Sequence, residues 1–227
     1  MLCILQARMS SKRLPGKTLK SIQGKKILEI VCNQISKSKY ISEIVVATSR
    51  HNSDDKIFSF CKKKEIKIYR GSLNNVASRF LQIIKKKNYK EFVRINADSP
   101  LSNFIIIDRL CKEYLKGKSQ IVTNVFPRTF PKGQSVEVIK SSLIKKHINK
   151  FNKNDCEHVS SFFYRNYKHF KIINIKNRIN QSMYNLAIDT KKDFNNINSI
   201  VANYGLHNFK ISKLNANLKK KILHGKI

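Results

Sequence analysis

Residues 3–20 read CILQARMSSKRLPGKTLK, an apolar strand that runs directly into a loop rich in cations. Four basic side chains crowd this loop: Arg8, Lys12, Arg13 and Lys17. Like charges on one short turn repel one another unless a polyanion lies among them, and Gly16 permits a close backbone approach that a side chain would block. The stretch therefore predicts a phosphate-binding loop at a strand end, with a nucleoside triphosphate as the natural ligand.

Apolar runs and helical periodicity alternate along the first half of the chain. Strands are expected at Leu2–Gln6, Glu43–Thr48, Glu65–Tyr69 and Glu91–Ile95. Helices are expected between and after them, at Lys26–Ser36, Asp54–Lys63, Asn74–Lys86 and Ser102–Leu115. This order predicts an α/β fold with a mostly parallel central sheet flanked by helices.

The second half of the chain alternates less regularly. Strands are expected near Gln120–Thr123, Gln134–Ile139, His169–Ile175 and Asn185–Ile188. Helices are expected over Ser142–Asn149, Asn154–Tyr164 and Lys191–Tyr204. At 227 residues the chain suits one domain, which we place at residues 1–212, and residues 213–227 are expected to form a basic C-terminal tail or surface helix.

Cysteine usage and hydropathy restrict the cellular setting. The five cysteines are odd in number and lie mostly in apolar runs, which indicates core residues in a reducing compartment. No charged N-terminal region precedes a long apolar stretch, and no apolar run reaches the roughly eighteen residues of a membrane span. We therefore expect a cytoplasmic protein without membrane insertion.

The formal net charge of +32 would by itself favour a nucleic-acid partner. The lysines, however, are scattered in short runs over the predicted helices, and no stretch interleaves aromatic and basic residues as a base-stacking surface does. Solvated helix faces explain such a pattern more simply. We expect no nucleic-acid partner, and a basic nucleic-acid-binding protein remains an alternative.

A P-loop NTPase or kinase is a further alternative, because residues 16–18 read GKT, the end of a phosphate-binding P-loop. Ser11 stands where the first glycine of that motif belongs, and Pro15 lacks an N–H that the loop would use. The helical period of residues 104–115 also places Asp108 on a helix, away from the strand end that such an enzyme requires. These departures make the P-loop interpretation the weaker one.

Two aspartates follow predicted strands at the sheet edge where the cationic loop begins. Asp98 follows the strand Glu91–Ile95, and Asp189 follows Asn185–Ile188. One or two carboxylates together with phosphate oxygens suit Mg²⁺, and ligands bind at this edge of open parallel sheets. Each aspartate could equally cap the helix that comes after it. The residues alone leave both interpretations open.

Residues 123–138, TNVFPRTFPKGQSVEV, form the second informative stretch. Two prolines stiffen a long loop, and Asn124, Arg128 and Glu137 offer the mixed polar contacts that a sugar needs. The stretch therefore predicts a lid or an acceptor pocket. The later pair Glu157 and His158 begins a predicted helix, where an acceptor contact and a helix-start hydrogen bond are equally good explanations.

Taken together, these motifs resemble the cytidylyltransferase family of spore coat polysaccharide biosynthesis protein F and, more distantly, the acylneuraminate and 3-deoxy-manno-octulosonate cytidylyltransferases. The matching stretches are collinear over residues 2–200: 6–17, 70–72 with 79–80, 94–101, 128–131 with 137–138, 157–159 and 189–190. One departure is Ser135, where the family often has aspartate. The resemblance implies a nucleotide-diphospho-sugar transferase fold, Rossmann-like and of GT-A type.

The resemblance also implies an activity, the transfer of CMP from CTP to a sugar or sugar acid with release of pyrophosphate, dependent on Mg²⁺ and serving surface polysaccharide or glycan biosynthesis. It implies a homodimer. The implied catalytic residues are Arg8, Lys17, Asp98 and Asp189, the two aspartates holding Mg²⁺. The implied nucleotide-binding residues are Gln6, Ala7, Arg8, Arg13, Lys17, Thr48, Arg70, Gly71, Ser72 and Asn96. The implied acceptor-binding residues are Asn124, Arg128, Glu137, Glu157 and His158.

Overall fold

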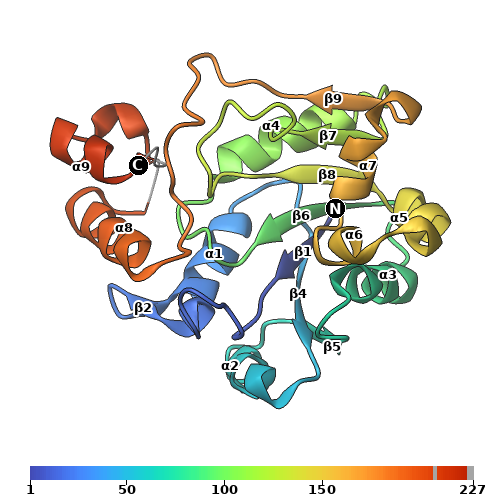
Figure 1. Ribbon diagram of the computed structural model, residues 1–227, viewed down its shortest axis with the longest axis horizontal. Coiled ribbons are helices and arrows are strands. Elements are labelled where there is room, and N and C mark those ends of the chain that lie inside the picture. The colour runs from blue at the N-terminus through green and yellow to red at the C-terminus, as the bar shows by residue number, and fades with distance from the viewer. Residues whose placement is uncertain (207–208, 224–227) are drawn as a thin grey trace.

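A seven-stranded sheet lies at the centre of the computed structural model, which describes residues 1–206 and 209–223 (Figure 1). Its order is β5-β4-β1-β6-β8-β7-β9. The strands are β1 (Leu2–Gln6), β4 (Glu43–Ser49), β5 (Ile68–Gly71), β6 (Glu91–Asn96), β7 (Ile121–Thr123), β8 (Glu137–Lys140) and β9 (Ile172–Asn174). Only β8 runs antiparallel to its neighbours among these strands, so the predicted mostly parallel sheet is confirmed.

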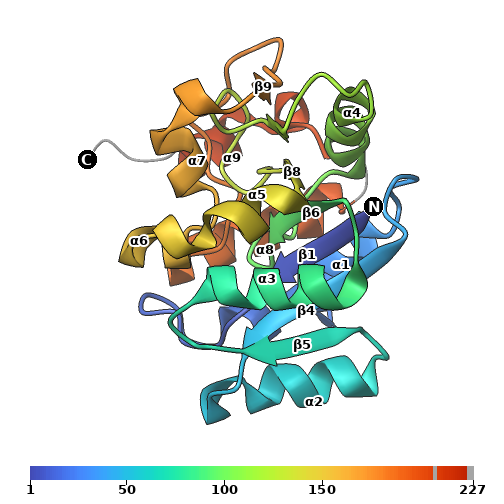
Figure 2. The ribbon, with the colours of Figure 1, turned by 90° about the vertical axis from the view of Figure 1, so that its right-hand side faces the viewer.

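Helices cover both faces of the sheet (Figure 2). On one face lie α1 (Ile27–Ile35), α2 (Asp55–Lys63), α4 (Phe104–Tyr114), α8 (Lys191–Tyr204) and the short α9 (Ala216–Lys221). On the other lie α3 (Val76–Lys87), α5 (Ser141–His147), α6 (Lys153–Glu157) and α7 (Ser161–Arg165). The cationic loop continues into one turn of 3-10 helix, Lys17–Leu19, and a small hairpin of β2 (Ser21–Ile22) and β3 (Lys25–Lys26).

Strand β1 shows why the apolar runs form central strands. Cys3 and Leu5 pack in the core cluster of the α1 face, whereas Leu2 and Ile4 pack in the cluster of the α3 face. Successive strand side chains point to opposite sides, so a strand covered on both faces needs apolar residues at every position. The continuous apolar start of the chain thus determines a buried strand with the cationic loop at its carboxyl end.

Two predicted elements in the second half are wrong. Residues 185–188 form no strand: the segment makes only isolated bridges, from Asn185 to Lys132 and from Tyr184 to Leu223. The predicted helix 154–164 is interrupted at His158, whose ψ of 75° is not helical. Buried Asp155 explains the interruption of this helix at His158. Its carboxylate accepts hydrogen bonds from Ser161 and Arg165 of α7, and these bonds turn α7 back on α6.

Strand β5 begins later than predicted, at Ile68 and not at Glu65. Glu65 has a φ of 54°, a left-handed conformation that ends the turn after α2 and cannot continue an extended strand. The shift carries the strand to Gly71, at the edge of the sheet where the cationic loop also lies.

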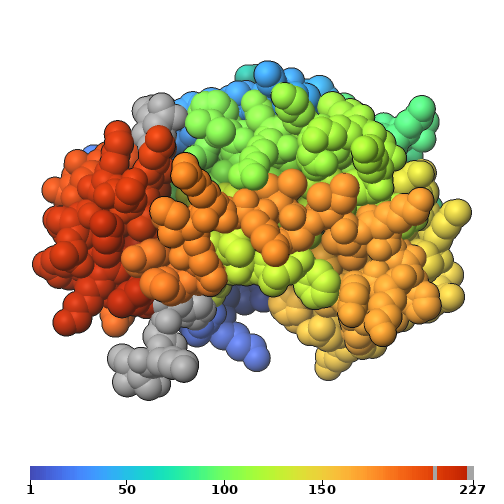
Figure 3. Space-filling model, turned by 90° about the horizontal axis from the view of Figure 1, so that it is seen from above, coloured from blue at the N-terminus to red at the C-terminus, as the bar shows by residue number. Residues whose placement is uncertain are grey.

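The C-terminal segment packs against α8. Leu214, Leu218 and Ile222 are buried in the same core cluster as the α8 side chains, and the red C-terminal residues adjoin the orange segment that precedes α8 (Figure 3). Residues 224–227 of the predicted tail lie outside the described residues. No helix within 1–206 or 209–223 has the length and apolar character needed to cross a membrane.

Gly133 brings two distant segments into backbone contact, and its replacement is expected to be costly. A Cβ at this position would lie 2.5 Å from the Leu186 carbonyl carbon, and φ is 94°. Gly133→Ala should lower the free energy of unfolding by about 2–4 kcal/mol, measured by urea denaturation. Gly117→Ala is the matched control, with φ of 74° and open space around it, and should cost only about 1–2 kcal/mol. Equal losses would contradict the close-approach explanation.

Candidate active site

A cleft of about 650 Å³ opens at the carboxyl ends of β1 and β6. The cationic loop forms one wall, and the segments around Arg128 and Asp189 form another. Of the predicted site residues, the cleft is lined by Gln6, Ala7, Arg8, Arg13, Lys17, Asn96, Asp98, Arg128, Glu157, His158 and Asp189. Residues from five separate predicted stretches therefore meet in one place.

Lys17 lies at the centre of the cleft wall and makes three short contacts. Its Nζ donates to Asp98 Oδ2 at 2.7 Å, to Asp189 Oδ1 at 2.8 Å and to the Ile188 carbonyl at 2.7 Å. An ammonium has three donors, so this one is fully satisfied. Burial by itself lowers the pKa of Lys17, but the two carboxylates outweigh it and raise the pKa above its ordinary value.

Neither aspartate caps a helix, which resolves the alternative that the sequence left open. Helix α4 is capped by Asn103, and α8 by Thr190 in a capping box with Asp193. Asp98 and Asp189 are also held together by the backbone, because the Ile188 amide donates to the Asp98 carbonyl at 2.9 Å. Their carboxylates therefore take no part in capping and both face the Lys17 ammonium.

Asp189 carries the densest set of cations in the cleft. Besides Lys17, Lys132 Nζ lies 2.5 Å and Arg13 Nη2 3.1 Å from Asp189 Oδ2. Burial favours the neutral acid, but hydrogen bonds from Lys132 and Lys17 outweigh burial and hold the Asp189 pKa well below its usual range. Asp189 is therefore a carboxylate at neutral pH.

The two aspartates offer the oxygen donors that a hard divalent cation prefers. Both accept from the Lys17 ammonium at 2.7–2.8 Å, so that ammonium occupies the point where their oxygens converge. Within the described residues no group of three or more His, Cys, Asp or Glu side chains could hold a metal ion. A hard cation such as Mg²⁺ would consequently need ligand phosphates or water to complete its shell, which is its usual habit.

The Arg8 side chain reaches across the cleft to Glu157, which with His158 forms a pair of predicted acceptor residues. Its Nη2 lies 3.0 Å from Glu157 Oε1, and about four-tenths of each side chain is exposed. The break between α6 and α7 at His158 leaves both Glu157 and His158 on the cleft wall. An exposed pair of this kind contributes little to stability and exchanges partners easily.

Two predicted acceptor residues lie behind the cleft. Glu137 is 2% exposed and pairs with Arg94 and Tyr164, so its carboxylate is already committed. Asn124 is fully buried: its side chain donates to the Gln134 carbonyl at 2.8 Å and accepts from the Val136 amide at 2.9 Å. Both residues stabilise β8 and the loop before it. Both side chains are buried, and neither lines the cleft.

Arg128 reaches the cleft with neutral partners. Its Nη1 donates to Ser135 Oγ at 3.0 Å and lies 3.5 Å from the Pro131 carbonyl. Burial lowers its pKa from the ordinary arginine value, an effect that the nearby Glu137 charge partly offsets. Arg128 thus offers a partly desolvated cation to whatever occupies this end of the cleft.

Four predicted nucleotide residues lie apart from the cleft. Thr48 is fully buried, and its Oγ1 has no hydrogen-bond partner in the described ranges. Gly71 and Ser72 line a neighbouring hollow of about 700 Å³. Arg70 donates to the Ser49 carbonyl at 2.9 Å and to Asp55 at 2.5 Å. Their role in nucleotide binding stays a prediction.

Sequence reasoning assigned no role to Lys132, although it lines the cleft and contacts Asp189. Its position next to Gly133 was the available signal, since a glycine that permits a close backbone approach places its neighbour against the opposite segment. The Lys132 amide donates to the Tyr184 carbonyl and the Leu186 amide to the Lys132 carbonyl, at 3.0 and 2.7 Å. These bonds position the lysine beside Asp189.

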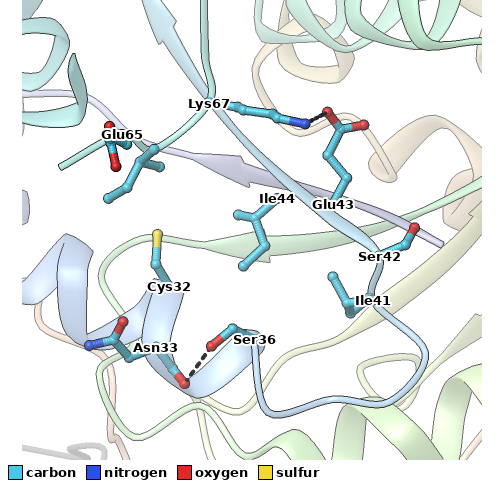
Figure 4. A pocket seen from close by; sticks show the side chains of 10 residues that line it. Cys32, Asn33, Ser36, Ile41, Ser42, Glu43, Ile44, Glu65 and Lys67 are labelled. Atoms are coloured by element: carbon cyan, nitrogen blue, oxygen red, sulfur yellow. Dashed lines mark hydrogen bonds and ion pairs between the residues drawn. The ribbon is translucent and has the colours of Figure 1, made fainter.

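A separate cavity of about 330 Å³ lies at the opposite, amino-terminal edge of the sheet (Figure 4). Cys32, Ile41 and Ile44 provide apolar walls, and Lys67 bridges to Glu43 at 2.9 Å. Ligands of open parallel sheets bind at the carboxyl ends of the strands. The cleft around Lys17, and not this cavity, is therefore the candidate active site.

Comparisons with known proteins agree with the fold. The Cytidylyltransferase family model matches residues 2–219. Spore coat polysaccharide biosynthesis protein SpsF of Bacillus subtilis is 26% identical over 212 residues, covering 90% of this chain and 87% of the relative. A cytidylyltransferase structure from Leptospira borgpetersenii is 30% identical with a TM-score of 0.86, covering 100% of this chain and 98% of that one.

A more distant structure shares the fold alone. CMP:2-keto-3-deoxy-manno-octonic acid synthetase, solved in complex with CTP, is 12% identical with a TM-score of 0.67 and covers 89% of this chain and 98% of its own. The structural neighbours confirm the nucleotidyltransferase, Rossmann-like fold. Because the family model spans nearly the whole chain, this protein belongs to the cytidylyltransferase family and is a nucleotidyltransferase.

The buried Glu137 pair generates a test of stability against pH. Burial opposes the charge on Glu137, but Arg94 outweighs it and lowers the pKa. A lowered folded pKa stabilises the protein above the unfolded value of about 4.3, and that contribution is lost as pH falls through the folded pKa. Glu137→Gln should therefore cost about 3–5 kcal/mol at pH 7 and progressively less below about pH 4.

Urea denaturation over a pH series measures this difference. Glu113→Gln is the matched control, because Glu113 pairs with Lys116 at the surface, at 2.6 Å with the lysine more than half exposed, and should cost under about 1 kcal/mol. A Glu137→Gln loss that does not change with pH would show that the carboxylate charge is not the source of the stabilisation.

Proposed function

We propose that this cytidylyltransferase transfers CMP from CTP to a sugar or sugar acid and releases pyrophosphate, with Mg²⁺ held by Asp98 and Asp189. The observation that carries the proposal is the convergence of both carboxylates on Lys17 Nζ, inside a cleft whose lining also includes Arg8, Arg13, Arg128 and Lys132. The complex with CTP named for the distant structural neighbour supports the choice of nucleotide, and the sugar acid in that protein's name supports the choice of acceptor.

The reaction is an in-line displacement at the α-phosphorus of CTP. A hydroxyl oxygen of the acceptor attacks, a P–O bond forms, the bond to the leaving pyrophosphate breaks, and the hydroxyl proton is released to water. Phosphoryl-type transfers of this kind depend mainly on positioning and charge neutralisation. Bound Mg²⁺ would supply part of that neutralisation at the phosphate oxygens.

The side chains of the cationic loop supply the rest. Lys17 bonds both carboxylates and fixes their position in the cleft wall. Arg8 and Arg13 are more exposed and hold their acidic partners by single contacts, so a triphosphate can replace those partners at small cost. Lys132 extends the same row of positive charge from the opposite wall.

The acceptor end of the cleft is lined by Arg128, Glu157 and His158. Arg128 provides a cation whose protein partners are neutral oxygens, which suits a carboxylate or phosphate on the acceptor. His158 and Glu157 can exchange hydrogen bonds with sugar hydroxyls. A panel of sugar acids and sugar phosphates, assayed for pyrophosphate release from CTP, would identify the acceptor.

Two substitutions test the catalytic assignment. Lys17→Ala and Asp98→Asn each remove a preorganised charge contact, typically about 3 kcal/mol of barrier, so turnover should fall about a hundredfold or more. Pyrophosphate release from CTP measures it, and circular dichroism verifies the fold. Asp108→Asn is the matched control, because Asp108 lies on α4 and accepts from Ser38 away from the cleft. Rates near wild type in both site variants would refute the proposal.

A further inference from the structure

Arg79 differs from the other arginines discussed above by being buried without a partner. It is 1% exposed, and its Nε, Nη1 and Nη2 have no hydrogen-bond acceptor in residues 1–206 or 209–223. A buried unpaired guanidinium is strongly unfavourable, because its hydration is lost and nothing replaces it. A ligand that accepts hydrogen bonds from the guanidinium would remove this cost.

Arg79 lines a hollow beside the active-site cleft. This hollow, of about 700 Å³, is formed by the carboxyl ends of β4 and β5 and the start of α3, with Gly71, Ser72, Ser78 and Gln82 among its walls. Since β4 pairs in parallel with β1, it lies on the same sheet edge as the cationic loop. A nucleotide whose phosphates bind at that loop would direct its base along this edge.

The neighbourhood of Arg79 is charged but offers it no hydrogen bond. Burial lowers the Arg79 pKa to about 10, and the positive charge of Arg8 adds to this effect while the negative charge of Asp54 opposes it. The Asp54 carboxylate is already committed to the Met9 amide at 2.7 Å and to the Ser49 amide at 3.1 Å. The guanidinium therefore lies at the hollow with its donors unused.

Arg70, the arginine that sequence resemblance places by the base, is in the opposite situation. It donates to two backbone carbonyls and to Asp55, and its guanidinium stacks 5.2 Å from the Phe58 ring centroid. Reading a base would require breaking these contacts. Arg70 thus fixes the end of β5, and Arg79 has the free donors.

Gly71 connects the two arginines. A Cβ at Gly71 would lie 2.7 Å from Arg79 Cγ, so glycine is what allows the Arg79 stem to pass over the end of β5. The backbone φ of residue 71 does not require glycine, so the close approach of the Arg79 side chain is what explains the glycine at this position. The close approach places the head of Arg79 against the hollow and not in solvent.

We propose that Arg79 is the specificity-determining residue for the base, its guanidinium donating to O2 and N3 of the cytosine of CTP. This inference rests on the proposed function. Guanidinium carries only donors, and cytosine presents two adjacent acceptors, O2 and N3. Uracil carries a hydrogen on N3, which would face a donor and leave Arg79 partly unpaired, and sites built to hydrogen-bond one group reject analogues that cannot.

Binding measured by titration calorimetry tests the assignment, with CTP, UTP and inorganic tripolyphosphate as ligands. Wild type should bind CTP at least about tenfold more tightly than UTP. Arg79→Met should lose that preference while its tripolyphosphate affinity stays within about twofold. Arg79→Lys, which keeps the charge but lacks the planar fork, should also lose most of the preference. Arg70→Met is the comparison variant and should retain it.

The melting temperature without ligand separates a binding role from a structural one. Methionine removes an unpaired buried charge and keeps the apolar stem, so Arg79→Met should melt at or above the wild-type temperature. A lower melting temperature combined with an unchanged CTP-to-UTP ratio would overturn the inference and leave Arg79 a structural residue. A wild-type protein without preference for CTP would overturn the proposed function itself, and this inference with it.

Discussion

The ammonium of Lys17 is the contact on which the rest of the site depends. Two carboxylates that are distant in the chain would repel each other if they converged without a cation between them. Lys17 occupies that point, bonded to Asp98, Asp189 and the Ile188 carbonyl. The backbone bond from Ile188 to Asp98 makes the same junction in the main chain, at 2.9 Å. Charge and backbone geometry thus place the acids together.

Charge in this cleft is balanced by pairs of unequal strength. Lys17 and Asp189 are largely buried and multiply bonded, whereas Arg8 and Arg13 hold single, more exposed partners. A polyanion that binds here would meet Arg8 and Arg13, which can leave their acidic partners at little cost in free energy. The carboxylates bonded to Lys17 would stay in place. Arg79 extends this pattern toward the neighbouring hollow, as a cation with no acidic bond partner in the described ranges.

The strands and helices that the sequence predicted correctly were those with a strong periodicity of apolar residues. The buried strands β1, β4 and β6 and helices α1 and α8 lie within a residue or two of the expected ranges. The failures have physical causes outside local pattern: Asn185–Ile188 lies against Gly133 and makes isolated bridges, with no strand ladder. The interrupted helix at His158 follows from the ion pair of Asp155 with Arg165, which no spacing rule reveals.

The amino-acid sequence by itself determined the alternating layers, the cationic loop at the end of β1 and the position of Asp98 beyond β6, because burial on both faces requires uninterrupted apolar runs and leaves polar residues at their ends. Only the tertiary structure decided which polar groups meet. It set Lys132 beside Asp189, turned Glu137 away from the cleft into a buried pair with Arg94, and left Arg79 unpaired while Arg70 found partners. Hydrogen bonds and ion pairs act over a few ångströms, so their partners depend on how distant segments pack and not on their spacing along the chain.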